Sequence, residues 1–338
     1  MRTSKYILTA DDYGAIDYID QGIIKAIRAG KINSVACFTT RFERNGETEL
    51  PERIQKLLDL KKEGFEFSIG LHFCISAGFS NDVDTMLYGN SLTKENKGKK
   101  RHDFKSAINY RFNQVKEEHL EKELRSQIKI LQDLLGTEPI DSISNHHGLV
   151  YINTNLFRPY ARVAAELNIP IRAPLTWRKA DLKVSNWDRK MFNPTIREGI
   201  KLKMLDQLRN ALDSKSRIKI SQNLDLFHPT CLVDEFYGQP FKPNLEQLFQ
   251  AFNDATFSAE FMFHLADAEY RVQQGLNEDE SAKIKSFDGI DSGYFKWREM
   301  EFNTLMNTDI PAKPTRTVFR GLAEIDREKP IWLVNARK

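Results

Sequence analysis

The residues best suited to catalysis are two adjacent aspartates and several histidines, each predicted at the end of a β-strand. They are Asp11, Asp12, His72, His146, His147 and His264. Neighbouring carboxylates repel when both are ionised, and a bound cation relieves the repulsion while a second, unligated aspartate stays available as a base. Two histidines and one carboxylate are a common metal-ligand set, and water held by such an ion becomes a nucleophile near neutral pH. His264 would then be available as a proton donor. The pattern predicts metal-assisted hydrolysis.

Each of these residues also has a purely structural interpretation. The aspartate pair could cap the helix predicted to follow it, since aspartate is a good N-cap residue. His72 could be a hydrogen-bonded structural histidine, and the pair at 146–147 a polar turn. His264 could be a satisfied core histidine among apolar neighbours. If the residues were only structural, all of these interpretations would have to hold at once on one rim of the fold. A shared functional site explains the clustering with one assumption and is therefore favoured. His228 follows another possible strand and is a weaker candidate, while His102 and His119 are read as solvated.

Short apolar runs alternate with longer stretches of helical periodicity along the chain. We expect strands over residues 5–10, 34–40, 66–72, 139–144, 169–173 and 260–264. We expect helices over residues 16–29, 51–62, 120–135, 155–167 and 245–252. Asp17 and Asp20 are read as helix caps or surface charges. This alternation is typical of an α/β fold with a parallel sheet, and about seven strands fit a (β/α) barrel-like fold related to the TIM barrel. The working residues of such a barrel lie at the C-terminal ends of its strands.

Two segments look like additions to a single domain over residues 1–310. The polar segment at about 81–110 contains the basic run KENKGKKR and is expected to be a solvated loop, with an active-site lid as the alternative. Residues 311–338, which include three prolines, are expected to form a C-terminal extension.

The composition narrows the classes of function. The chain has 338 residues and a net charge of only +3, so we do not expect nucleic-acid binding. It has no apolar run long enough to span a membrane, and its N-terminus lacks the features of a secretory signal. Three widely spaced cysteines are neither a disulfide framework nor a zinc ribbon. We therefore expect a cytoplasmic protein. The oligomeric state is left open, with a homodimer as one option.

Several short segments follow one another in an order that is specific to one family. They are TADDYG at 9–14, DQGI at 20–23, GLHFCI at 70–75, ELRSQI at 123–128, SNHH at 144–147, IPIR at 169–172, FH at 263–264 and RE at 298–299 with Glu301. In these segments the sequence resembles the YdjC-like carbohydrate deacetylases, whose motifs include T-A-D-D-F/Y-G, G-L-H-L-N-L and D-S-H-x-H. The match runs in order from residue 7 to about residue 306.

The resemblance implies a (β/α) barrel-like fold and removal of an acetyl group from an N-acetylated sugar, such as a chito-oligosaccharide. It also implies one divalent metal ion, Mg²⁺ or Zn²⁺. Carried over by position, the metal ligands would be Asp12, His72 and His146. Asp11 would be the general base and His264 the general acid. The residues expected to contact the substrate are Arg172, His147 and Tyr13, with orientation of a catalytic carboxylate as a second role for Arg172.

The sequence departs from the family pattern at four places near these residues. Ser144 replaces an aspartate, so a partner of the metal ligands is lost or replaced. Gly148 replaces the second histidine of the same motif, and Cys74 replaces an asparagine. The turn after His264 is Leu265-Ala266 instead of Pro-Gly. The changes at Ser144 and at 265–266 keep open a non-catalytic carbohydrate-binding protein on the same fold. The same cation and carboxylates could also serve a metal-dependent phosphoesterase, which is the other alternative.

Overall fold

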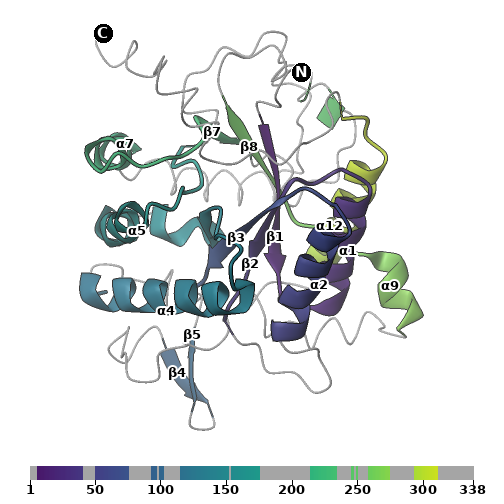
Figure 1. Ribbon diagram of the computed structural model, residues 1–338, viewed down its shortest axis with the longest axis horizontal. Coiled ribbons are helices and arrows are strands. Elements are labelled where there is room, and N and C mark those ends of the chain that lie inside the picture. Colours follow the sequence, from purple (N-terminus) through teal and green to yellow (C-terminus); the bar gives the residue numbers. More distant parts are fainter. Residues whose placement is uncertain are drawn as a thin grey trace.

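A parallel β-sheet with helices around it positions the residues discussed above (Figure 1). The structure is a computed structural model that describes residues 6–40, 50–75, 93–96, 99–102, 115–151, 154–175, 214–233, 245–246, 249, 258–274 and 293–310. Within this part of the chain, no helix combines the length and the apolar character that crossing a membrane requires. The predicted helix over residues 245–252 lies mostly outside the described residues.

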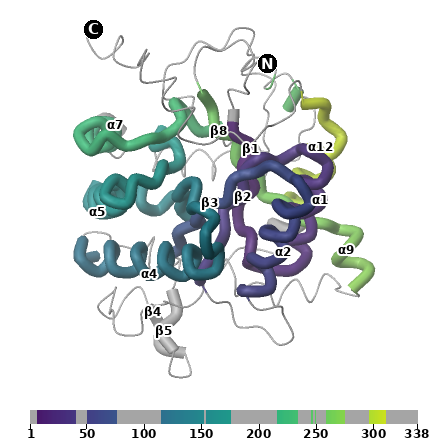
Figure 2. The backbone as a smooth tube through the Cα atoms, in the orientation of Figure 1, coloured from purple at the N-terminus to yellow at the C-terminus, as the bar shows by residue number. Residues whose placement is uncertain are grey.

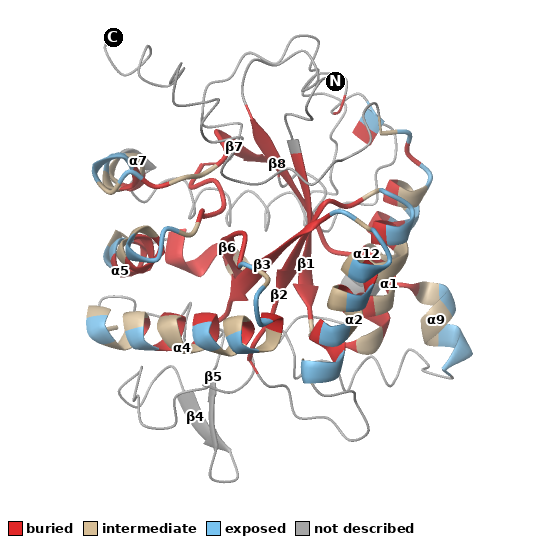
Figure 3. Cartoon of the chain, viewed as in Figure 1, coloured by how far each residue is buried: buried red, intermediate tan, exposed pale blue. Residues whose placement is uncertain are grey.

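Six parallel strands form the sheet in the order β6-β3-β2-β1-β8-β7. They are β1 (Tyr6–Tyr13), β2 (Ser34–Cys37), β3 (Ser68–Phe73), β6 (Ile143–Asn145), β7 (Cys231–Val233) and β8 (Ala259–Phe263). The strands are buried along their length, as Figure 3 shows in red, because both faces of the sheet are covered. Burial on both faces explains why these strands read as continuous apolar runs in the sequence.

The helices pack outside the sheet in two groups (Figure 2). One group contains α1 (Asp17–Arg28), α2 (Leu50–Lys62), α9 (Ala268–Gln273) and α12 (Gly293–Met306). The other contains α4 (Glu117–Leu135), α5 (Thr154–Glu166) and α7 (Ser214–Asn223). The four helices predicted within the described residues are confirmed to within about three residues at each end. α4 turns an apolar stripe towards the core, and Gly136 follows it with a φ of 63°.

The segment predicted as a strand at 169–173 makes only an isolated bridge between Ile171 and Ile143. Pro170 has no N–H to donate, so a regular ladder cannot extend through it. The segment nevertheless makes hydrogen bonds on both sides. On one side Arg172 N donates to Ile143 O at 2.9 Å, and on the other Ile171 N donates to Phe227 O at 2.9 Å. The parallel sheet of the described residues thus has six strands and curls into a half-barrel, which agrees with the predicted α/β fold with a parallel sheet.

The polar insertion differs from the expected loop. It contains an antiparallel pair, β4 (Thr93–Asn96) and β5 (Lys99–His102), with Asn96 opposite Lys99. This pair forms a separate two-stranded sheet. Two residues, Lys97 and Gly98, separate the strands in the sequence, and a two-residue connection containing glycine is a typical hairpin signal.

Candidate metal centre

Two carboxylates reach the same site because β1 is irregular near its C-terminal end. β1 pairs with β2 at Ala10↔Val35 and at Tyr13↔Cys37, so Asp11 and Asp12 together lie opposite a single residue of β2. Such a bulge redirects side chains that would otherwise alternate between the two faces of a strand. Asp12 adopts a φ of 72°, a left-handed conformation that is uncommon for residues other than glycine and that clusters at functional sites.

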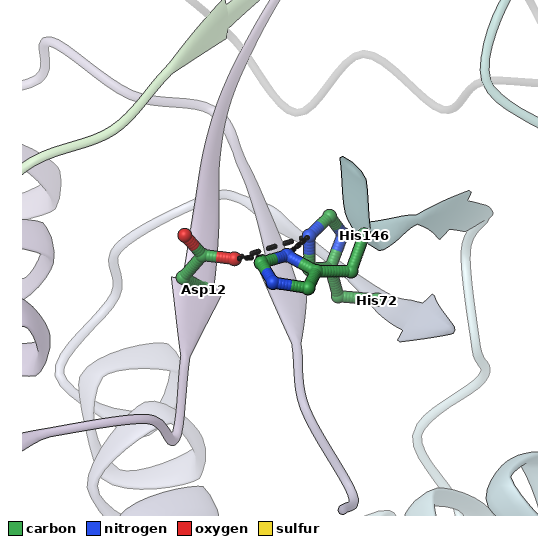
Figure 4. Close-up of side chains that lie close together, drawn as sticks. All are labelled: Asp12, His72 and His146. Atoms are coloured by element: carbon green, nitrogen blue, oxygen red, sulfur yellow. Dashed lines mark hydrogen bonds and ion pairs between the residues drawn. The ribbon is translucent and has the colours of Figure 1, made fainter. Parts of the chain in front are cut away.

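Three side chains from different segments converge at the C-terminal edge of the sheet (Figure 4). Asp12 comes from β1, His72 from β3, and His146 from the start of the 3-10 helix η2 (His146–Tyr151) after β6. Asp12 Oδ1 lies 3.1 Å from both His72 Nε2 and His146 Nδ1. The two ring nitrogens are 3.2 Å apart. All three residues are buried, and we call them the triad.

The triad fits a divalent cation. Two ligand atoms at about 2.1 Å from an ion and roughly 90–109° apart are separated by about 3.0–3.4 Å. The three separations observed in the triad fall in this range. Asp12 Oδ1 is buried, yet it accepts no well-aligned hydrogen bond from the described residues. Its equal distances from the two ring nitrogens suit an ion bound among the three ligand atoms.

The second oxygen of Asp12 is held by a residue from the far end of the chain. Arg298 on α12 donates from its guanidinium to Asp12 Oδ2, and both side chains are almost completely buried. Burial alone would raise the pKa of Asp12, but the charge of Arg298 and the ring of His146 hold it well below its usual range. One turn along α12, Glu301 accepts a hydrogen bond from the backbone N–H of His264 at 2.9 Å. α12 therefore supports two predicted site residues at once.

Asp11 lies beside the triad and is fixed by Arg172. The guanidinium makes a two-pronged contact, with its two terminal nitrogens 2.6 and 2.7 Å from the two oxygens of Asp11. Arg172 Nε also donates to Glu260 Oε1 at 2.9 Å. Burial would raise the pKa of Asp11, but the charge of Arg172 lowers it, so this carboxyl is ionised. Asp11 Oδ2 is 3.9 Å from His72 Nε2, which places it next to a triad ligand.

His264 follows β8 directly and approaches Asp12 from the Oδ2 side, where its Nε2 lies 3.9 Å from that oxygen. Burial, and next the charge of Arg298, lower the pKa of His264 to about 3. The ring is therefore neutral near pH 7 in the metal-free protein. The turn after it packs tightly on α1: Asp267 N donates to Tyr18 O at 3.0 Å, and Gly22 leaves no room for a side chain against Ala266. This packing builds the turn without the proline and glycine of the family motif.

Neighbouring side chains orient the two histidine ligands. His72 Nδ1 lies 2.7 Å from Ser144 Oγ, so the position where the family has an aspartate still contacts this ring. The Phe38 ring meets both imidazoles edge-on, with centroids 5.0 Å from His72 and 4.9 Å from His146. His147 packs on His146 with ring centroids 3.7 Å apart, and it is half-buried with a φ of 57°.

Two sequence-based interpretations need correction, and a third stays a prediction. Tyr13, expected to contact substrate, is completely buried, and its hydroxyl donates to Arg53 O at 2.7 Å. Its contact with substrate stays a prediction. Asp20, expected to be a cap or surface charge, is buried and accepts hydrogen bonds from Gly14 N and from Arg53. His228 precedes β7 instead of following a strand.

Sequence reasoning missed three buried charged residues around the triad. Glu260 was read only as part of a strand, and Arg298 and Glu301 only as part of a motif. The spacing of Arg298 and Glu301 could have indicated a shared role, because residues three apart on a helix share one face. A buried glutamate inside an apolar strand such as β8 also requires a charged or hydrogen-bonding partner.

Comparisons with known proteins identify relatives of this chain in sequence and in fold. The sequence model of the YdjC-like protein family matches residues 5–313. A carbohydrate deacetylase of Danio rerio is 25% identical over 166 residues, which are 49% of this chain and 48% of that protein. A carbohydrate deacetylase of Oceanobacillus iheyensis is 24% identical over 204 residues, which are 60% of this chain and 78% of that protein. The chain thus spans about half the length of the first of these relatives. A crystal structure from Enterococcus faecalis V583, of a protein named for cellobiose-phosphate cleavage, shares the fold with a TM-score of 0.52. It is 16% identical, with 90% of this chain and 99% of that one covered.

Proposed function

Because the chain belongs to the YdjC-like protein family, we propose that it is a metal-dependent carbohydrate deacetylase, a hydrolase that removes an acetyl group from an N-acetylated sugar. The observation that carries the proposal is the convergence of Asp12, His72 and His146 beside a second, separately held carboxylate, Asp11. Curated relatives named carbohydrate deacetylase support the choice of substrate class.

The triad would hold one divalent cation. Two nitrogens and one oxygen suit Zn²⁺, and Mg²⁺ remains the alternative. Bound there, the cation would supply Lewis acidity and lower the pKa of a water molecule. The charges around the triad favour such an ion. Within the described cluster the carboxylates Asp11, Asp12 and Glu260 face only two guanidiniums, Arg172 and Arg298.

The two remaining residues would move protons. Asp11 is ionised and fixed by Arg172, so it is suited to take a proton from the water that attacks the acetyl carbonyl. His264 would protonate the departing nitrogen. Since its pKa is about 3, its ring is neutral at rest and carries a single N–H proton, and we propose that it takes up the proton released by water as its second only as negative charge develops on the oxygen of the tetrahedral carbon. The proton given up by water is then the one needed by the amine, and acetate and a free amino sugar leave. His147, half-buried against His146, would contact the sugar.

The experiment is acetate release from a panel of N-acetylated mono- and oligosaccharides, with and without a chelator. We expect chelator-sensitive release by the unaltered protein and none by Asp11→Asn, which should still bind the cation. Asp59→Asn on the exposed side of α2 is the matched control and should keep full activity. Near-normal release by Asp11→Asn would remove this residue from the base role.

Variants of the ligands test the cation site separately. His72→Ala and His146→Ala should lose the cation, and a variant that still binds one ion per chain would exclude its residue from the ligand set. A protein that binds the cation tightly but releases no acetate from any sugar would point to another acyl substrate, to a phosphoester, or to a binding role.

We also propose that residues 1–310 form one barrel domain whose sheet closes through the segment at 170–175. In addition to the bonds already described, Leu232 N donates to Leu175 O at 2.8 Å. This segment therefore links β6 to β7, the two edges of the sheet. Closure predicts that the amide of Ile171 exchanges with solvent as slowly as amides of the central strands. Rapid exchange there would indicate an open sheet.

A further inference from the structure

Ser144 sits beside a triad histidine because of the register of two strands. His72 on β3 and Ser144 on β6 are direct partners in the parallel ladder, so their side chains leave the sheet on the same face. Two residues earlier, Ser142 takes the corresponding place next to Gly70. A Cβ on Gly70 would lie 2.3 Å from Ser142 Oγ, so glycine is what allows the two strands this close approach. The strand pairing therefore fixes the distance between Ser144 and His72.

The hydroxyl of Ser144 has two partners. Its Oγ lies 2.7 Å from His72 Nδ1 and 3.3 Å from the carbonyl oxygen of Leu71. A hydroxyl group has one proton to donate, and a carbonyl oxygen only accepts. If that proton is directed to Leu71, Oγ must accept the hydrogen bond from His72, which then carries its own proton on Nδ1.

This arrangement determines which nitrogen of His72 is available as a ligand. With the proton on Nδ1, Nε2 presents a lone pair, and Nε2 is the atom that lies 3.1 Å from Asp12 Oδ1. The same Nε2 lies 3.2 Å from His146 Nδ1, and a lone pair on Nε2 can accept a hydrogen bond from that ring in the metal-free protein. The second ring nitrogen of a metal-binding histidine usually donates to a carboxylate, a carbonyl or water, and this contact fixes tautomer and orientation.

From these contacts we infer that Ser144 is a positioning residue for the metal site: it holds His72 as the Nδ1–H tautomer and so prepares Nε2 to bind the cation. The inference rests on the proposed cation site. It assigns to a neutral hydroxyl the place that the family pattern gives to an aspartate. Ser144 contacts neither substrate nor cation, and acts only through His72.

The test compares three variants by equilibrium titration with Zn²⁺. Ser144→Ala removes the acceptor and should weaken binding about 10–100-fold, the usual cost of losing such a partner. Ser144→Thr keeps the hydroxyl and should bind within about threefold of the unaltered protein. Ser142→Ala is the matched control, because it removes a buried hydroxyl from the same face of the same segment, and it should leave Zn²⁺ affinity unchanged. Circular dichroism verifies that each variant is folded.

A spectroscopic readout separates positioning from a general structural effect. In the Zn²⁺-loaded protein, ¹⁵N NMR of the histidine side chains should show a protected Nδ1–H on His72, retained in Ser144→Thr and exposed to exchange in Ser144→Ala. Unchanged Zn²⁺ affinity in Ser144→Ala, or coordination of His72 through Nδ1, would overturn the inference. If the unaltered protein binds no cation, both this inference and the proposed function are wrong. If it binds Zn²⁺ with the Ser144 dependence described but releases no acetate, only the proposed function fails.

Discussion

Replacing Arg172 by methionine should destabilise the protein strongly, because this residue is the charged partner of two buried carboxyl groups. Its guanidinium makes three hydrogen bonds of 2.6–2.9 Å to Asp11 and Glu260, and all three side chains are at most 3% exposed. Removing one partner of a buried ion pair costs about 3–5 kcal/mol, since a charge is left without compensation. Domains are stable by only about 5–15 kcal/mol, so the variant should lose a large fraction of its free energy of unfolding.

The loss should depend on pH in a defined direction. Burial raises the pKa of Glu260, and Arg172 opposes that rise in the unaltered protein. Without Arg172 the folded-state pKa of this carboxyl rises further above its value in the unfolded chain. A group with a raised folded pKa contributes stability in acid, and this contribution is lost as the pH rises through the folded pKa. The difference in stability between Arg172→Met and the unaltered protein should therefore be larger at pH 8 than at pH 5.5.

The assay is urea unfolding in the presence of a chelator at these two pH values. Arg162→Met is the matched control, because Arg162 also pairs with two glutamates but its side chain is 39% exposed. Exposed pairs contribute about 0–1 kcal/mol, so this control should change little. The double variant Arg172→Met/Glu260→Gln should recover part of the loss. If Arg172→Met is no less stable than Arg162→Met, or if its loss is independent of pH, the charge balance described for this cluster is wrong.

Three further predictions concern the turn, the first helix and the cation. In Gly22→Ala the new Cβ would lie 3.0 Å from the backbone of Ala266, and we expect a loss of about 1–3 kcal/mol in urea unfolding. Acetate release should fall too because the turn holds His264, and unchanged release would contradict this. The pKa of Asp20 is raised by burial to about 7, so its contribution to stability is present in acid and declines by up to about 1.4 kcal/mol per pH unit as the pH rises from about 4 to 7. Asp20→Asn should make the measured decline shallower by this amount, and an unchanged slope would show that Asp20 is not the titrating group. Adding Zn²⁺ at about 100 times its dissociation constant should stabilise the protein by about 2.7 kcal/mol in thermal unfolding. His72→Ala should show no such gain, and an equal gain would place the ion elsewhere.

The strand ends could be predicted from the sequence because they depend on local patterns. Buried parallel strands read as continuous apolar runs, and polar residues that follow such runs fall at one edge of the sheet. This reasoning predicts that Asp12, His72 and His146 lie at the same edge of the sheet. The bulge in β1 could not be predicted, because a register shift depends on the pairing of two strands and not on either sequence alone.

The residues that surround the triad were harder to predict because they are distant in the sequence. Arg298 is 286 residues from Asp12, and Glu260 is 88 residues from Arg172. No local periodicity connects such pairs. The replacement of an aspartate by Ser144 suggested a lost contact, but the strand register restores the contact with a different group. Whether a departure from the motif removes a contact therefore depends on which atom reaches the His72 ring, and not on the residue type alone.

In two of the triad residues, a neighbouring side chain contacts the polar atom that points away from the proposed ion. Ser144 takes the Nδ1 side of His72, and Arg298 takes Oδ2 of Asp12. With Oδ2 bound to a guanidinium, Asp12 has only Oδ1 to offer and would bind a cation through one oxygen. A hydrolytic ion needs coordination positions left open for water and for the carbonyl of the substrate. An aspartate that bound through both oxygens would fill one of those positions, so with an ion bound the contact from α12 would leave that position free for chemistry as well as hold the ligand in place.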